Sequence, residues 1–295
     1  MKIAIIGLGN VGSTIAYQLC NIDKVNELVL FDIDDNKAKA QKLDIEDGNA
    51  SLNKEIKISY NNDQELNDTD IIIYCVSIGG IPNNRLEEYK ITKKITEDVA
   101  KQINNTKFNG IIICVSNPVD IITNYLQKLL NYDYHKIIGS GTLLDTSRLK
   151  CYLSNKLDTK IKDITGYIIG EHGSTQVPVL SSFKINNRSL LTLINDEDKN
   201  SVHKEALERA LFVKETKGFT NYGIASSVSL IVDIIINHKN NIISISTYDE
   251  KEDLYYGYPS IFKDNKFIRQ EISLLDNEKE LLNKSIASII KVKDF

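Results

Sequence analysis

The sequence predicts an α/β protein in which a doubly wound parallel sheet is fused to a second, α+β part. Three observations lead to this prediction. Short apolar runs alternate with helical periodicity over the first 140 residues or so, a glycine-rich turn follows the first run, and the pattern changes after about residue 142. Buried parallel strands read as continuous apolar runs, and the helices between them supply the crossover connections.

The expected strands of the first part are rich in Ile and Val and cover residues 3–6, 28–31, 71–76, 111–116 and 137–138. Helical periodicity fills the intervals at 10–21, 34–44, 85–103 and 118–131. The second part carries helical stretches at 144–157, 206–215 and 222–238, and strand-like stretches at 164–169, 177–179 and 183–185. More strands and a closing helix follow. With no linker or repeat in between, we expect two closely fused domains, 1–141 and 142–295.

Gly7, Gly9 and Gly12 form a G-x-G-x-x-G pattern at the first strand-to-helix junction, and Asp32 stands 20 residues beyond the last glycine. This context predicts a Rossmann-type dinucleotide site. Gly7 permits the tight turn, Gly9 lets a pyrophosphate approach the backbone, and Gly12 lets the helix pack closely. The helix beginning near Val11 offers its N–H groups to the phosphates. Asp32 accepts ribose hydroxyls and repels a 2′-phosphate, so the expected cofactor is NAD.

Composition narrows the class of protein further. A formal net charge of −4 and a pI of about 5.7 predict neither a nucleic acid nor an acidic membrane surface as partner. No apolar run approaches membrane-spanning length, and a core strand at the N-terminus leaves no room for a signal peptide. The four cysteines form no C-x-x-C pair, so neither a metal site nor a disulfide framework is expected. We expect a cytoplasmic protein that acts on a small molecule.

Ligands in such sheets bind outside the carboxyl ends of the strands, so the residues that follow each expected strand are candidates for a site. Four segments there carry polar or glycine residues, namely 77–85, 116–120, 139–148 and 170–173. The last of these embeds His172, one of only four histidines, in a turn between Gly170 and Gly173. These segments are expected to converge on one site.

Together the candidates suit the oxidation of a 2-hydroxy acid. His172 titrates near working pH and is the candidate base, and Asp145 is the candidate partner that orients its ring. Arg148 lies three residues after Asp145, hence on the same helix face, and its planar fork suits a carboxylate. Arg85, at the end of a glycine-bearing loop, is the candidate that polarises the substrate carbonyl. Taken singly, each has a structural alternative, such as a helix-start residue or a surface ion pair.

The chain resembles the L-lactate/malate dehydrogenase superfamily over essentially its whole length. The segments that carry the resemblance are 5–12, 116–120, 135–136, 139–146, 170–173, 217–220 and 222–223. Within the superfamily, the Ser77–Ile81 run resembles the L-2-hydroxyisocaproate dehydrogenase branch. The resemblance implies that His172 is the acid/base, Asp145 its partner, Arg148 the carboxylate anchor and Arg85 the polarising group.

The resemblance also implies the remaining contacts. Asn117 touches both substrate and nicotinamide, and Thr220 lies against the substrate side chain. The residues implied to line the cofactor are Gly7, Gly9, Asn10, Val11, Gly12, Asp32, Ser77, Ile78, Val115 and Asn117. A homodimer or homotetramer is expected, working as an NAD-dependent L-2-hydroxyacid dehydrogenase of the lactate or hydroxyisocaproate type.

The loop before Arg85 departs from the family pattern. It is one residue shorter than in lactate and malate dehydrogenases. Where malate enzymes carry an Arg and lactate enzymes a Gln, this chain has Gly80, or Ile81 if the gap is placed differently. Without a cation there, dicarboxylates should bind badly, while a small residue leaves room for a larger apolar side chain. Branched or medium-length 2-oxo acids are therefore expected ahead of oxaloacetate, with lactate dehydrogenase activity as the near alternative.

A second departure concerns regulation. The sugar-bisphosphate site of allosteric bacterial lactate dehydrogenases uses an Arg and a His at positions that here are Lys150 and Thr165. We therefore expect no activation by fructose 1,6-bisphosphate. The alternatives to the enzyme prediction are a malate dehydrogenase, an NAD-dependent glycosidase, which needs a metal-binding Cys/His pair, and a non-catalytic NAD-binding homologue, which would be expected to lose part of the His/Asp/Arg set.

Overall fold

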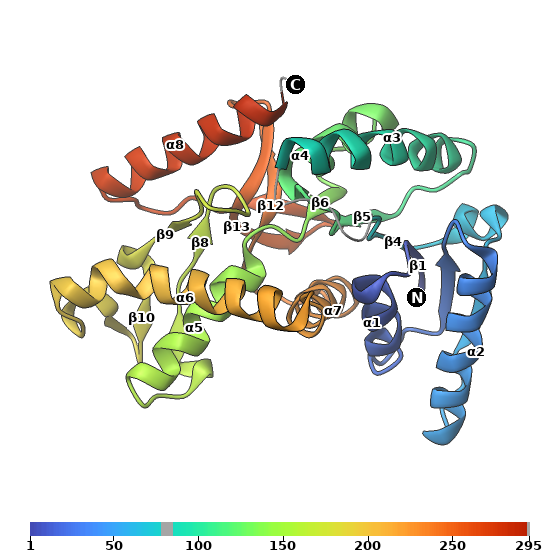
Figure 1. Ribbon diagram of the computed structural model, residues 1–295, viewed down its shortest axis with the longest axis horizontal. Coiled ribbons are helices and arrows are strands. Elements are labelled where there is room, and N and C mark those ends of the chain that lie inside the picture. Colours follow the sequence, from blue (N-terminus) through green and yellow to red (C-terminus); the bar gives the residue numbers. More distant parts are fainter. Residues whose placement is uncertain (78–84, 294–295) are drawn as a thin grey trace.

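The computed structural model describes residues 1–77 and 85–293 (Figure 1). Its centre is a nine-stranded sheet in the order β14-β13-β12-β6-β5-β4-β1-β2-β3. The first six strands are parallel: β1 (Lys2–Ile6), β2 (Glu27–Phe31), β3 (Lys57–Tyr60), β4 (Ile71–Tyr74), β5 (Ile111–Cys114) and β6 (Ile137–Gly139). This confirms the doubly wound parallel sheet. Strand β3 was not expected, because it is an edge strand in which only Ile58 is fully buried.

The crossover helices explain why these strands are apolar throughout. They are α1 (Asn10–Leu19), α2 (Asp35–Ser51), α3 (Arg85–Asn104) and α4 (Val119–Leu130). Ile3 and Ile5 of β1 pack into a core that α1 and α7 cover, and Ala4 and Ile6 face a second core beneath α3 and α4. Figure 1 shows these two pairs of helices on opposite sides of the sheet. Covering both faces buries every residue of β1, β4, β5 and β6.

The second part begins after β6. Its helices are α5 (Leu143–Lys156), α6 (Asp196–Lys217), α7 (Tyr222–Asn237) and α8 (Asp276–Lys293). Its short strands are β7 (Ile164–Thr165), β8 (Ile168–Ile169), β9 (Val177–Pro178), β10 (Lys184–Ile185) and β11 (Arg188–Ser189). Short 3-10 helices lie at Ile161–Asp163, Leu180–Ser182 and Leu190–Thr192 in this part, and at Asp63–Asp68 in the first part. A third core lies between α5, α6 and the small sheet β11-β10-β7.

Three strands of the second part extend the main sheet. These are β12 (Ile242–Asp249), β13 (Leu254–Lys263) and β14 (Lys266–Arg269), all antiparallel to their neighbours. The join is made between Ser246 of β12 and Gly139 of β6. A Cβ at position 139 would lie 2.8 Å from the Cβ of Ser246, so glycine is needed for this close approach. The sheet therefore runs without interruption across the expected boundary at residue 141.

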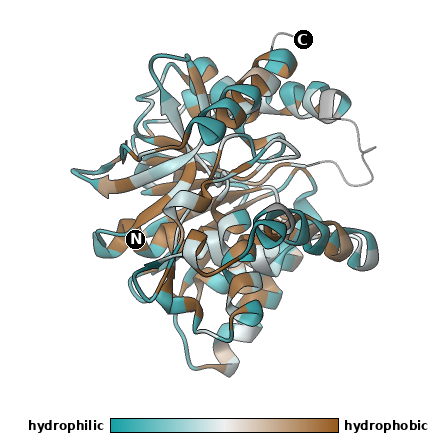
Figure 2. Ribbon diagram, turned by 90° about the vertical axis from the view of Figure 1, so that its left-hand side faces the viewer, coloured by the Kyte–Doolittle hydropathy of each residue, from teal (hydrophilic) through white to brown (hydrophobic). Residues whose placement is uncertain are grey.

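Hydropathy follows the layers. Figure 2 shows hydrophobic residues gathered along the strands and the inward faces of the helices, with hydrophilic residues on the outward faces. No single helix in the described ranges is both long and apolar enough to cross a membrane. Helices α6 and α7 pass that test only as a pair, and the pair is bent by 118°. Nine of the residues of α7 are buried inside the protein.

Candidate active site

The glycine-rich turn has the shape that a dinucleotide needs. Gly7 adopts a φ of +97°, and a Cβ there would lie 2.8 Å from the carbonyl oxygen of Cys75. A Cβ on Gly12 would lie 1.9 Å from the carbonyl oxygen of Gly7, so the turn and α1 pack as closely as backbones allow. Gly9, by contrast, has nothing within 4 Å of its Cβ position. This open space at the N-terminus of α1 fits a pyrophosphate group.

Asp32 ends β2 beside this turn and is held by several donors. Its Oδ2 accepts hydrogen bonds from the Leu8 N–H at 2.9 Å and from Lys37 Nζ at 3.0 Å. Burial works to raise the pKa of Asp32, but Lys37 and the backbone N–H groups hold that pKa below its usual value. The sequence analysis missed Lys37. The sequence feature that could have indicated Lys37 is its place in the first turn of α2, three residues after the N-cap Asp34, which accepts its backbone N–H.

Asp145 and Arg148 lie on one face of α5, as their spacing predicted. Arg148 Nη1 donates to Asp145 Oδ1 at 2.9 Å, and His172 Nδ1 lies 2.6 Å from Asp145 Oδ2. The side chain of Asp145 is only 5% exposed. Burial alone would raise the pKa of Asp145, yet the charges of His172 and Arg148 hold it below its ordinary value. The structure thus brings His172 and Arg148 onto the two oxygens of one buried carboxylate.

The turn that carries His172 follows β8 and is fixed from two sides. The His172 N–H donates to Asp120 Oδ2 at 2.8 Å, and the Glu171 N–H donates to Ser285 Oγ at 2.7 Å. Gly170 pairs with Gly257 of β13 and adopts a φ of +84°. The sequence analysis marked the segment that contains Asp120 but gave the residue no role.

The other expected site residues lie at the carboxyl edge of the sheet or near it. Val115 and Asn117 follow β5 and are half-buried, and the Asn117–Pro118 peptide is cis. Ser77 follows β4 and is exposed. Thr220 lies in the connection between α6 and α7, both of which pack against α5. The next residue, Asn221, donates to Thr14 Oγ1 of α1 at 3.0 Å, which ties this connection to the dinucleotide part.

Three expected positions are not covered by these observations. Ile78 and Gly80 lie outside the described residues, and so does the side chain of Arg85. The backbone of Arg85 begins α3. Among the described residues, no group of three or more His, Cys, Asp or Glu side chains is placed to hold a metal ion.

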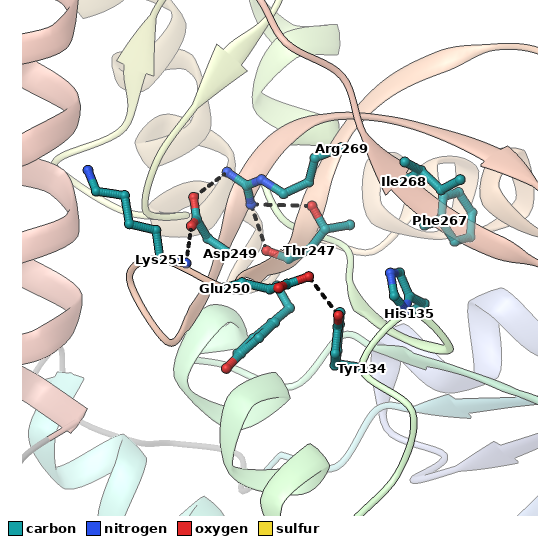
Figure 3. A pocket seen from close by; sticks show the side chains of 10 residues that line it. Tyr134, His135, Thr247, Asp249, Glu250, Lys251, Phe267, Ile268 and Arg269 are labelled. Carbon is teal, nitrogen blue, oxygen red and sulfur yellow. Dashed lines mark hydrogen bonds and ion pairs between the residues drawn. The ribbon is translucent and has the colours of Figure 1, made fainter.

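A separate hollow lies on the same main sheet, and none of the expected site residues line it. It is lined by residues of β12 and β14 together with Tyr134 and His135 (Figure 3). Its polar groups bond to one another. Arg269 Nη1 donates to the Thr247 carbonyl at 2.8 Å and its Nη2 lies 3.4 Å from Asp249, while the Tyr134 hydroxyl donates to Glu250. Arg269, Asp249 and Glu250 thus interact with other residues that line the hollow.

Comparison with known proteins agrees with this geometry. Residues 1–139 match the family model of the lactate/malate dehydrogenase NAD-binding domain, and residues 142–294 match the alpha/beta C-terminal domain of the same enzymes. An L-lactate dehydrogenase of Borrelia turicatae is 34% identical, with 95% of this chain and 92% of the relative covered. One from Halalkalibacterium halodurans is 32% identical, with 98% and 95% covered.

A solved structure gives the same result. The minor L-lactate dehydrogenase of Enterococcus mundtii in its ligands-bound form superposes with a TM-score of 0.95 at 29% identity. The alignment covers 99% of this chain and 97% of that one. The two family models together, and each of the two relatives, cover nearly the whole chain. The residues matched by the models include the dinucleotide turn, Asp145, Arg148 and His172. The chain therefore belongs to the lactate/malate dehydrogenase family.

Proposed function

We propose that the protein interconverts L-2-hydroxy acids and 2-oxo acids with NAD, and that its substrates are monocarboxylates of the lactate type and their longer aliphatic homologues. The observation that carries the proposal is the shared carboxylate of Asp145. One of its oxygens faces the ring of His172 and the other holds Arg148, so a proton-transfer group and a carboxylate-binding group are oriented by one buried anion.

His172 is the proposed acid/base. Its Nδ1 faces Asp145 at 2.6 Å, which selects the tautomer with the proton on Nδ1 and directs Nε2 to the substrate. Because Asp145 stays anionic, it stabilises the imidazolium that forms when His172 takes the hydroxyl proton. In the direction of reduction, the same imidazolium returns the proton to the developing alkoxide.

Arg148 is the proposed anchor for the substrate carboxylate. A guanidinium has five N–H donors in a planar fork, and the Nη1 bond to Asp145 holds that fork in place beside His172. Arg85 is proposed as the group that polarises the 2-oxo carbonyl, Asn117 as a contact to both substrate and nicotinamide, and Thr220 as a contact to the substrate side chain.

The proposed dinucleotide contacts follow from the turn described above. The backbone at Gly7, Gly9 and Gly12 receives the pyrophosphate at the start of α1, and Asp32 receives the ribose hydroxyls. When bound, NAD supplies the centre that takes up or returns the substrate hydride. The remaining proposed contacts are Asn10, Val11, Ser77, Ile78 and Val115.

We also propose the assembly and location of the enzyme. Exposed apolar side chains occur on the neighbouring helices α1, α2 and α7, at Tyr17, Leu43 and Leu230. Such exposure supports a homodimer or homotetramer, which light scattering on the purified protein measures. The cytoplasm is the proposed compartment, and residues 1–141 and 142–295 are the proposed domains.

The test of the proposed function is a panel of 2-oxo acids followed by NADH absorbance. Pyruvate, 2-oxobutyrate, 2-oxoisocaproate and phenylpyruvate are expected to be reduced with graded efficiencies, because one methylene in an apolar pocket is worth only about 1–3 kcal/mol. Oxaloacetate is expected to be the poorest substrate, since its second carboxylate has no cation at Gly80. A wild-type preference for oxaloacetate, or no NADH oxidation with any member, contradicts the proposal.

One variant sharpens this test. Gly80→Arg introduces the cation that malate enzymes carry in the loop. The ratio of oxaloacetate to 2-oxoisocaproate turnover should therefore rise, because the second carboxylate is then paired instead of desolvated alone. An unchanged ratio would show that this position does not face the substrate.

A further inference from the structure

A second buried carboxylate, Asp120, contacts the backbone of His172. Asp120 occupies the first turn of α4 and is 2% exposed. Its Oδ2 accepts the backbone N–H of His172 at 2.8 Å, and its Oδ1 accepts the hydroxyl of Ser246 at 2.6 Å. Both oxygens are therefore used, one on the turn that carries the proposed acid/base and the other on β12.

The place of Asp120 in the fold makes it a junction. Asn117 precedes α4 and lies three residues before Asp120, so one short segment holds the proposed substrate contact and the carboxylate that accepts the His172 N–H. Ser246 in turn pairs with Gly139, directly before the turn that leads into α5 and Asp145. Asp120 thus connects α4, the His172 turn and the β6–β12 join.

The charge of Asp120 is costly in this position. Burial raises its pKa to about 6, while the hydrogen bonds from Ser246 and the His172 N–H, together with the charge of His172, work in the opposite direction. A carboxyl with this pKa is mostly ionised at neutral pH. The start of α4 adds the favourable end of a helix dipole.

The charged and titratable groups around Asp120 and His172 come from several elements. Glu171 works to raise the pKa of Asp120, and Asp120 in turn works to raise the pKa of the Cys114 thiol in β5. The ring of His172 contacts Asp145 of α5, which also pairs with Arg148, and His203 of α6 interacts electrostatically with Asp145. His172 therefore contacts two buried carboxylates, Asp145 with its ring and Asp120 with its backbone N–H.

We propose that Asp120 is a positioning residue for the proposed reaction: it fixes the backbone of His172 and adds the negative charge that sets the pH range over which His172 carries its proton. The inference rests on the proposed function for its catalytic meaning. Its electrostatic content can be measured without any substrate.

The variant that isolates the charge is Asp120→Asn. The amide has the shape of the carboxylate, its oxygen accepts the His172 N–H, and its NH₂ donates to Ser246 Oγ, so both hydrogen bonds are kept. Losing a nearby anion destabilises the imidazolium. The midpoint of the His172 titration should therefore fall by about half a unit or more, as expected for one charge at the edge of a buried site.

Glu278→Gln is the matched control. Glu278 is also a buried carboxylate, 3% exposed, that accepts a backbone N–H and a serine hydroxyl, both from Ser181. It lies in the first turn of α8, and it also accepts the N–H of Leu275. The same chemical change there should leave the His172 titration where it is in the wild type.

Histidine ¹³C NMR measures the midpoint directly, because the chain has four histidines and His172→Gln assigns the signal. The pH profile of kcat/KM for 2-oxo acid reduction should show its falling limb displaced to lower pH by the same amount in Asp120→Asn. The KM for NADH should not change. Were the enzyme inactive on 2-oxo acids, the NMR shift would still test the inference separately from the proposed function.

Ser246→Ala is the second variant in case Asp120→Asn does not fold. It keeps the carboxyl but removes one of its donors, which raises the pKa of Asp120 and leaves it less ionised. The His172 midpoint should then move in the same direction by a smaller amount. If Asp120→Asn folds and leaves both the midpoint and the pH profile unchanged, or if Glu278→Gln shifts them equally, the inference is overturned.

Discussion

Lys37 Nζ lies 3.0 Å from Asp32 Oδ2, so the carboxylate expected to select NAD has a cation beside it in the structure. The side chain of Asp32 is 8% exposed, whereas that of Lys37 is 41% exposed and reaches it from α2. The pair has two consequences. Asp32 is held ionised by Lys37 and backbone donors, and Lys37 places a positive charge beside the carboxylate that we propose receives the ribose hydroxyls.

The first prediction follows from this pair. Asp32→Ser should narrow the preference for NADH over NADPH by at least about tenfold, mainly through the KM for NADPH. The repulsive anion is gone, and Lys37 is released to meet the phosphate. Steady-state kinetics with both cofactors measure the ratio. Adding Lys37→Met to Asp32→Ser should remove the gain in efficiency with NADPH. Equal efficiencies of the wild type with NADH and NADPH would contradict the prediction.

The second prediction concerns proton transfer. His172→Ala should lower turnover by about a hundredfold or more, because it removes the proposed acid/base and nothing else in the Asp145 constellation replaces it. NADH binding should persist, because the dinucleotide turn connects β1 and α1 and does not include His172. Fluorescence titration measures this binding. Near-normal turnover in this variant would assign His172 a structural role.

The third prediction concerns stability and pH. Folding raises the pKa of Asp120 from its ordinary value of 3.8 to about 6, so the folded protein binds this proton more tightly than the unfolded chain does. The contribution that this tighter proton binding makes to the free energy of unfolding is fully present below about pH 4. It is lost as the pH rises through about 6. At 1.36 kcal/mol per pKa unit, the loss at neutral pH is about 1–3 kcal/mol.

Asp120→Asn should remove this loss. Its free energy of unfolding in urea should exceed that of the wild type at pH 7 and match it near pH 4. Glu278→Gln, for which no such gain is expected, serves as the comparison. A variant that is destabilised equally at both pH values would mean that the charged form of Asp120 contributes to folding.

The fourth prediction concerns regulation. Fructose 1,6-bisphosphate should leave the saturation curve for the 2-oxo acid unchanged. Lys150 is half-buried on α5, where burial lowers its pKa, and Thr165 ends β7 with no charge to offer a phosphate. Initial rates with and without the effector measure this. A clear shift of the curve would place a phosphate site elsewhere in the second part.

Much of the fold could be predicted from local patterns. The apolar runs at 71–74 and 111–114 are buried strands as expected, because helices cover both faces of the sheet. The edge strand Lys57–Tyr60 was missed, since it alternates and buries only one residue. Helix α6 starts at Asp196, ten residues before the expected stretch, because residues 196–205 contain only one apolar residue, Val202, and so show no apolar periodicity.

The candidate site divides in the same way. Asp145 and Arg148 could be paired from their spacing alone, because residues three apart share a helix face. Asp120 and Lys37 could not, since an acid in a helix start and a lysine in a solvated first turn are common in any sequence. Asp120 depends on a partner 52 residues away, the N–H of His172. Lys37 depends on Asp32, which follows the preceding strand.

The sequence by itself determined the parallel sheet, the glycine turn with Asp32, and the Asp145–Arg148 pair, because each depends on periodicity or on backbone sterics within a few residues. The tertiary structure decided which side chains meet. His172 reaches Asp145 and Asp120 only because β8, α5 and α4 converge at one edge of the sheet, and β12 continues that sheet beside β6 to supply Ser246. Contacts of this kind arise from the packing of whole elements, and no local pattern encodes them.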